Sequence, residues 1–154
     1  MAYEVFISYS TNDLPIVEHI RKIIESPSVE VFVAEYSVSP GSQLASTILD
    51  AIKKCDLFVL IWSKHSKVSE WVPQEIGAAK GNNKTMLPLL LQKDLHLPAF
   101  IKDLKYLPAY DDPEKWLPAF RNEISSKAEK QELIKIGVIL CIGLATLWFL
   151  GRGK

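Results

Sequence analysis

The chain has 154 residues, which is room for one ordinary domain and little more. Its 18 acidic and 18 basic residues balance and the basic ones are scattered, so we expect no nucleic-acid partner. Cys55 and Cys141 have no cysteine or histidine at ligand spacing, which argues against a metal site or a disulfide framework and is typical of a reducing cytoplasm.

Apolar runs typical of buried strands alternate with segments whose apolar residues recur at helical spacing. The predicted strands are residues 3–9, 29–34, 56–62, 85–91 and a short one within 105–110. Helices are expected to begin at the caps Asn12 and Asp13, at Ser42, near Ser69 and at Asp112. The run 56–62 is the most hydrophobic and is expected at the sheet centre, whereas Pro88 places 85–91 near an edge or a bulge.

This alternation predicts one α/β domain over residues 1–126, with a flavodoxin-like parallel sheet of about five strands and helices on both faces. In such sheets the ligand crevice lies beyond the carboxyl ends of the strands. That edge is expected to carry residues 9–13, 35–41 and 63–75. The three histidines, His19, His65 and His96, have no ligand-spaced partner, and we assign none of them to catalysis.

Three motifs occur in an order that points to a known family. They are FISYS followed by Asp13, the segment PGSQLASTILDAI, and FVLIWS leading into SEWVPQEIGAA. Together, over about residues 3–124, they resemble TIR (Toll/interleukin-receptor) domains. That family contains scaffolds of signalling complexes and enzymes that cleave NAD at the nicotinamide–ribose bond, in immune or anti-phage responses.

The resemblance implies a set of site residues. Enzymatic members carry a glutamate in the helix after the third strand, often four residues after a tryptophan, and Glu75 and Trp71 match that spacing. Glu75 is therefore the implied catalytic residue, and the implied substrate-binding residues are Trp71, Tyr9, Ser10 and Ser63. At Ser10-Thr11, where some enzymatic members carry basic residues, this chain has hydroxyl groups. NAD would be the substrate, and no cofactor is expected.

A loop after the second strand is implied to mediate self-association of TIR domains. It consists of Glu35, Tyr36, Ser37, Val38, Ser39, Pro40 and Gly41. A chain that uses this loop without cleaving NAD would be a non-catalytic scaffold, and that is the main alternative. A third possibility is another glycosyl transfer on nucleosides, which also needs a single glutamate.

A single glutamate is chemically sufficient for NAD cleavage. Residues four apart share a helix face, so the Trp71 ring and the Glu75 carboxylate are expected to project together. Nicotinamide leaves from a cationic nitrogen and needs no general acid. One carboxylate therefore suffices to stabilise an oxocarbenium-like transition state. The helix dipole mildly favours the ionised form of that carboxylate. The alternatives are a solvated charge for Glu75 and a core anchor for Trp71.

Residues 133–150 form an apolar tail interrupted only by Lys135. As a helix the tail would be about 27 Å long, close to the thickness of a hydrocarbon core, and we expect it to span a membrane. Residues 127–132 are expected to be a short polar linker and 151–154 a short basic tail. Three lysines at the domain end of the tail, Lys127, Lys130 and Lys135, outnumber Arg152 and Lys154 at its other end, which weakly favours a cytoplasmic domain.

A further expectation concerns small residues in the tail. They recur every fourth position, at Gly137, Cys141 and Ala145, and this pattern predicts self-association in the membrane; the alternative is that such residues are common in any spanning helix. A buried core helix, or an oligomerisation helix of a soluble protein, is the alternative to a membrane span.

Overall fold

The computed structural model describes residues 2–33, 41 and 43–152. Its centre is a five-stranded parallel sheet with the strand order β2-β1-β3-β4-β5. The strands are β1 (Tyr3–Ser8), β2 (Val29–Phe32), β3 (Leu57–Trp62), β4 (Met86–Leu90) and β5 (Leu107–Pro108). This is the flavodoxin-like order, so the predicted fold is confirmed, and the most hydrophobic strand, β3, lies at the centre as expected.

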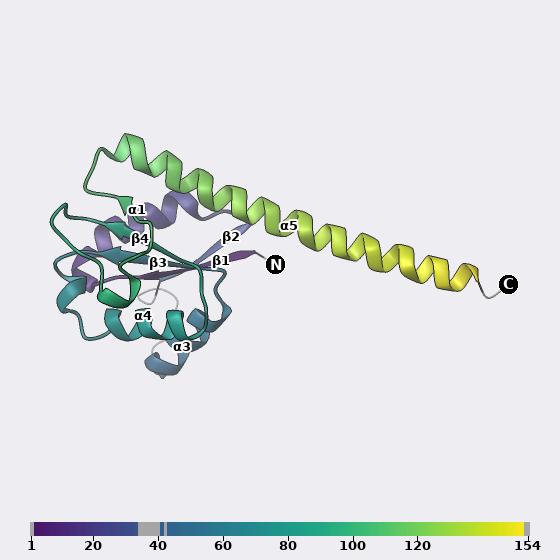
Figure 1. Cartoon of the computed structure of the whole chain (residues 1–154), viewed down its shortest axis with the longest axis horizontal. Helices are drawn as coiled ribbons and strands as arrows, with labels where there is room; N and C mark the ends of the chain where they lie inside the picture. The colour runs from purple at the N-terminus through teal and green to yellow at the C-terminus, as the bar shows by residue number, and fades with distance from the viewer. Residues whose placement is uncertain (1, 34–40, 42, 153–154) are drawn as a thin grey trace.

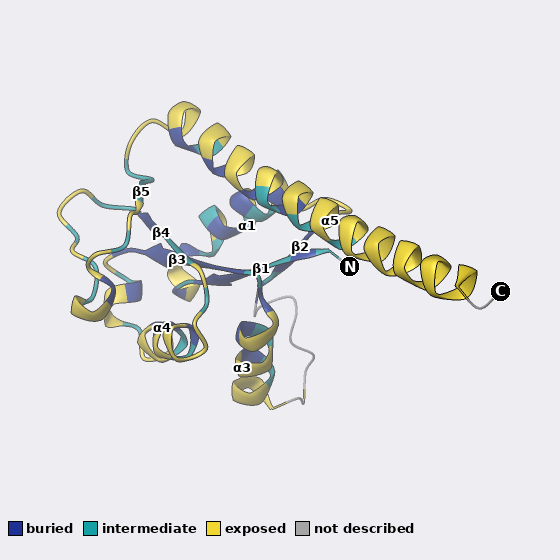
Figure 2. Cartoon of the chain, turned by 45° about the vertical axis from the view of Figure 1, so that its right-hand side comes forward, coloured by how far each residue is buried: buried dark blue, intermediate teal, exposed yellow. Residues whose placement is uncertain are grey.

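Helices cover both faces of the sheet (Figure 1). Helices α1 (Leu14–Ile24) and α5 (Pro113–Gly151) pack on one face, while α3 (Leu44–Lys54) and α4 (Val72–Gly81) pack on the other. Short 3₁₀ turns occur at η1 (Thr11–Asp13), η2 (Ser66–Val68) and η3 (Ala99–Ile101). Two apolar clusters separated by the sheet form the core, and Figure 2 shows the buried residues concentrated on the sheet and on the helix faces that meet it.

The helix starts follow the expected chemistry with two differences, at α1 and α4. Asp112 caps α5 by accepting a hydrogen bond from the Glu114 backbone N–H at 3.1 Å. Asp13 occupies the N-cap position of α1, but its side chain makes no capping hydrogen bond. Helix α4 begins at Val72 rather than near Ser69, with Pro73 in its first turn as expected. The cap expected at Ser42 lies outside the described residues.

Pro88 lies where β4 is paired on one side only. It stands opposite Leu60 of β3, whereas β5 pairs only with Leu89 and Leu90. A proline supplies no N–H to a ladder, so a position with one neighbouring strand tolerates it best. This agrees with the expectation that β4 lies near the edge of the sheet.

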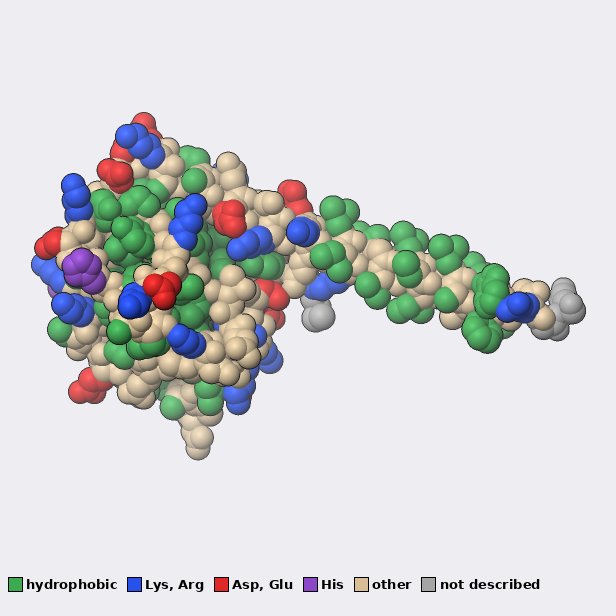
Figure 3. All heavy atoms as spheres, viewed as in Figure 1, with side chains coloured by type: hydrophobic (Ala, Val, Ile, Leu, Met, Phe, Trp, Pro, Cys, Tyr) green, Lys and Arg blue, Asp and Glu red, His purple; other side chains and the backbone are tan. Residues whose placement is uncertain are grey.

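Helix α5 is continuous over 39 residues, from Pro113 to Gly151. The segment 127–132, expected to be a linker, is therefore helical, and part of it packs on the domain. Ala128 is buried, and the Gln131 side-chain amide donates a hydrogen bond to the Asp56 carboxylate at 2.9 Å. Beyond residue 132 the helix projects from the domain with its apolar side chains exposed (Figures 1 and 3), and it is long and apolar enough to cross a membrane.

Candidate active site

A cavity of about 430 Å³ lies at the carboxyl ends of β1 and β3, where the topology predicts a ligand crevice. Its walls come from the end of β1 and η1, from α3, from the loop around η2 and from the start of α4. The lining residues are Ile7, Tyr9, Ser10, Thr11, Asn12, Leu44, Ile48, His65, Val68, Ser69, Trp71 and Glu75. Four of the five predicted catalytic and substrate-binding residues meet there.

Glu75 is the acidic residue of this lining. It lies in the first turn of α4, and its side chain reaches across to β1, where the Ser8 hydroxyl donates a short hydrogen bond to Glu75 Oε2. Burial raises the pKa of the Glu75 carboxyl from 4.5 to about 7, and the hydrogen bond from Ser8 opposes that shift. The sequence-based expectation of an ionised form favoured by the helix dipole is thus outweighed by desolvation.

Trp71 is the N-cap residue of α4, and its carbonyl accepts a hydrogen bond from the Glu75 N–H at 3.0 Å. The residue is 49% exposed, so the alternative of a buried core anchor is wrong. Since Trp71 and Glu75 line the same cavity, the four-residue spacing does bring them together. An exposed indole beside an enclosed carboxyl offers a flat surface on which a planar ring can stack.

Tyr9 and Ser10 form the wall that the end of β1 contributes. Tyr9 is partly buried and packs on the core cluster of α1 and α5. Ser10 is 8% exposed, and its carbonyl accepts a hydrogen bond from the Asp13 N–H at 2.8 Å. The hydrogen bond to the Ser10 carbonyl fixes the backbone of this wall.

Ser63 is outside the cavity lining. It is fully buried, and its hydroxyl donates to the Asp13 carboxylate at 2.5 Å while accepting from the backbone N–H groups of His65 and Ser66, each at 3.1 Å. The side chain predicted to bind substrate is therefore occupied in holding the loop that follows β3. Asp13 is 8% exposed and belongs to this same network, which explains why it does not cap α1.

The predicted self-association loop falls almost wholly outside the described residues, which exclude Glu35, Tyr36, Ser37, Val38, Ser39 and Pro40. Gly41 is described, and its φ of 84° is a backbone conformation that favours glycine.

The fold brings two further residues, Ser8 and His65, to this site. Ser8 is a buried polar residue at the carboxyl end of β1, and a hydroxyl group at that end of a mostly apolar strand was the available signal. His65, to which no role was assigned, lines the cavity together with Ser69 of the same loop. Its placement depends on the conformation of the loop after β3, for which the sequence carries no local pattern.

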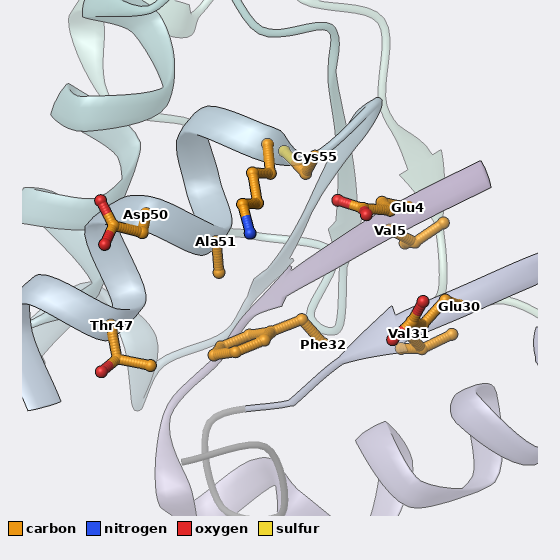
Figure 4. Close-up of a pocket in the computed structure, with 10 residues that line it drawn as sticks. Glu4, Val5, Glu30, Val31, Phe32, Thr47, Asp50, Ala51 and Cys55 are labelled. Atoms are coloured by element: carbon orange, nitrogen blue, oxygen red, sulfur yellow. The ribbon is translucent and has the colours of Figure 1, made fainter. Parts of the chain in front are cut away.

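A second cavity, of about 580 Å³, opens between β2, β1 and α3 on the α3 face of the sheet (Figure 4). Glu4 and Glu30 stand opposite each other on neighbouring strands there, and α3 adds the Asp50 carboxylate and the Lys54 ammonium group. Three carboxylates against one ammonium group leave the lining net negative, which disfavours phosphate groups, so this cavity is a poorer candidate for a nucleotide than the one at Glu75.

Comparison with protein-family models matches residues 5–123 to the TIR domain. No curated protein matches the chain. Among solved structures, the TIR domain of the Toll-related receptor TRR-2 from Hydra magnipapillata is similar at a TM-score of 0.69 and 20% identity, covering 83% of this chain and 99% of that one.

Two further structures share the fold. The CMP N-glycosidase BcmB from Clostridium botulinum is similar at a TM-score of 0.56 and 22% identity, covering 76% of this chain and 97% of that one. The TIR domains of the activated Roq1 resistosome are similar at a TM-score of 0.52 and 20% identity, covering 58% of this chain and 57% of that one. At these identities the likeness concerns the fold alone.

Proposed function

Since this chain belongs to the TIR domain family, we propose that it cleaves NAD at the nicotinamide–ribose bond, with Glu75 as the catalytic residue. The observation that carries the proposal is a partly buried carboxyl group, with a pKa raised to about 7, beside an exposed tryptophan in one cavity. A strongly perturbed carboxyl group in a cleft is characteristic of functional sites.

The reaction needs few groups. The bond between the ribose carbon and the pyridinium nitrogen breaks, and its electron pair stays on the nitrogen, so that neutral nicotinamide leaves. The remaining ribosyl cation accepts water, which loses a proton, and ADP-ribose forms; capture by an adenine nitrogen instead would give a cyclic isomer. The ionised Glu75 carboxylate binds the ribose hydroxyls and stabilises the cation, while Trp71 stacks on a ring of the substrate.

Partial burial of Glu75 strengthens this stabilisation. A charge pair interacts more strongly in a low-dielectric site than in water, so a desolvated carboxylate favours the cationic transition state more than an exposed one would. The Ser8 hydroxyl, which donates to Glu75, holds the carboxyl group in place and supports its ionised form.

The same pKa also permits a second chemistry. With its pKa raised to about 7, the Glu75 carboxyl group is available in protonated form near neutral pH, and a neutral base such as cytosine needs a proton as it leaves. The fold is shared with a CMP N-glycosidase, so CMP is the second substrate to test. The two chemistries differ in pH dependence: NAD cleavage requires the carboxylate, whereas expulsion of a neutral base requires the carboxylic acid.

The proposal includes a setting. We infer that the domain lies in the cytoplasm, where NAD is available, on a membrane span formed by residues 133–150 of α5. Self-association of TIR domains is a further part of the proposal, in line with the assembly from which the Roq1 domains come. A role in immune or anti-phage defence follows from the family resemblance.

Product analysis tests the proposal. The purified full-length chain is incubated separately with NAD and with CMP, and the products are identified by mass spectrometry. Nicotinamide with ADP-ribose or its cyclic isomer is the expected result. A folded chain that releases no base from either nucleotide would contradict the enzyme proposal and leave the scaffold function, whereas cytosine release alone would replace NAD by CMP.

A further inference from the structure

Helix α5 joins the domain to the apolar tail without a break. Its first part packs into the core through residues spaced by four, namely Trp116, Phe120, Ile124 and Ala128. In the following residues 133–150, Lys135 is the one charged side chain; exposed apolar side chains lie all around the helix, and none of the 18-residue apolar window is buried. A continuous helix transmits orientation, whereas a flexible linker would not.

The tail leaves the domain at the amino-terminal edge of the sheet. Gln131 is hydrogen-bonded to Asp56, which directly precedes β3, and a cavity beside α5 is lined by Tyr3 at the start of β1 and by the loop 26–28. Figures 1 and 2 show the start of β1 close to α5 where the helix emerges. The Glu75 cavity lies at the carboxyl ends of the strands, on the opposite edge.

The distance along the helix decides how close the domain comes to a membrane. Ala128, the last buried residue of α5, and Leu133, the first apolar residue of the tail, are five residues apart. Five helical residues span about 7 Å, and the headgroup layer on one side of a bilayer is about 5–8 Å thick. With the tail in the hydrocarbon, the amino-terminal edge of the sheet therefore reaches the headgroups.

Both ends of the tail carry groups suited to the interface. Lys135 stands at the domain end, where its long side chain can reach the headgroups. At the other end the Arg152 guanidinium lies 4.3 Å from the centre of the Trp148 ring, an aromatic–cation pair typical of the membrane interface. A helix without a polar face fits lipid better than a protein groove.

We propose that the continuous helix α5 fixes the orientation of the domain on the membrane. The amino-terminal edge of the sheet, centred on the loop Ser26–Ser28, is then an interaction surface for the headgroups of a lipid bilayer. The Glu75 cavity faces away from the membrane. This inference rests on the proposed membrane span and is independent of whether Glu75 cleaves NAD.

Fluorescence quenching tests the proposed orientation. The full chain, with Cys141→Ala to leave buried Cys55 as its only native cysteine, is reconstituted in phosphatidylcholine nanodiscs that contain a lipid with a headgroup-attached quencher. A fluorophore is placed at Ser28→Cys on the proposed contact surface or at Lys67→Cys on η2; both positions are exposed. We expect the label at 28 to be quenched several-fold more strongly than the label at 67. Equal quenching at the two positions, or a chain that remains outside the nanodiscs, would overturn the proposal.

A second variant tests whether the helix itself sets the orientation. A flexible insertion, Gly-Ser-Gly-Ser-Gly-Ser between Glu132 and Leu133, leaves both the domain and the apolar stretch intact. Quenching at position 28 should then fall towards the value at position 67, because the domain becomes free to rotate. Unchanged quenching at position 28 would show that something other than the continuity of α5 holds the domain on the membrane.

Discussion

At the scale of single residues, the ionised Glu75 carboxylate lies in surroundings that lower the stability of the fold at neutral pH. An exposed carboxyl group at the start of a helix would be ionised at neutral pH and mildly stabilising. Here the packing of α4 against β1 encloses the group, and its pKa rises to about 7. Three predictions follow from this residue and its aromatic neighbour.

The first prediction concerns the pH dependence of NAD cleavage. Because the carboxylate is the active form, kcat/KM for NAD should rise about tenfold per pH unit below pH 7 and level off above it. Steady-state rates from pH 5 to pH 9, with fold monitored by circular dichroism, measure this profile. A rate that falls as the pH rises through 7 would instead assign Glu75 the role of a general acid.

The second prediction concerns stability. The pKa of Glu75 is higher in the folded chain than its ordinary value of 4.5, so its stabilising contribution is complete below pH 4.5 and is lost as the pH rises through about 7. That loss amounts to at most about 3 kcal/mol. Glu75→Gln should remove this pH-dependent loss of stability, because the glutamine side chain does not ionise and can still accept the Ser8 hydrogen bond. Thermal melts in detergent should therefore show the variant gaining stability relative to wild type between pH 5 and pH 8. Parallel pH profiles for the two proteins would contradict the raised pKa.

The third prediction concerns Trp71. The residue is about half exposed, so Trp71→Ala should leave the melting temperature nearly unchanged. Loss of stacking should lower kcat/KM by about 5- to 150-fold, equivalent to about 1–3 kcal/mol. Phe100→Ala, which removes a similarly exposed ring outside the cavity lining, is the control and should leave the kinetics unchanged. A large fall in melting temperature with normal kinetics would show that Trp71 is a core residue and does not stack on the substrate.

At the scale of elements, the buried network of Asp13, Ser63 and Ser66 connects η1 to the loop after β3. That loop carries His65 and Ser69 of the cavity wall. Asp13→Ala leaves the Ser63 hydroxyl without its acceptor, so we expect the free energy of unfolding to fall by about 1–3 kcal/mol and KM for NAD to rise. Thermal melts and kinetics measure both effects, with exposed Asp111→Ala as the control. Full stability in Asp13→Ala would show that the network does not hold the loop.

The elements themselves were largely predictable, because apolar runs and helical spacing are local properties of the sequence. The parallel sheet and its crevice followed from the alternation of these elements, and four of the five substrate and catalytic residues lie there. The contact between Ser8 and Glu75 was not predictable, because it joins residues 67 apart and depends on how α4 packs. The direction of the Glu75 pKa shift was missed for the same reason.

The continuity of α5 was missed although a signal existed. The polar composition of residues 127–132 favoured a linker, but Ala128 continues the four-residue spacing of Trp116, Phe120 and Ile124. Polar residues on the remaining faces of a helix are compatible with that continuation.

At the scale of the whole molecule, the domain extends beyond residue 126 into the base of the projecting helix. A truncation ending at Glu132 keeps Ala128 and the hydrogen bond between Gln131 and Asp56, whereas one ending at Ser126 loses both. We expect the shorter fragment to be less stable by about 2 kcal/mol. Urea unfolding of the two fragments checks this, and equal midpoints and slopes would place the domain boundary at residue 126.

Cleavage of NAD by the Glu75 carboxylate can be checked by comparing three proteins. Nicotinamide release by the full-length wild-type chain is measured beside Glu75→Gln and Glu70→Gln at pH 8; Glu70 is an exposed glutamate one residue before Trp71 and outside the cavity lining. We expect Glu75→Gln to lose at least about a hundredfold in kcat while remaining folded, because a main electrostatic group is removed, and Glu70→Gln to keep the wild-type rate. A folded Glu75→Gln chain that releases nicotinamide at the wild-type rate would contradict the proposed role of Glu75.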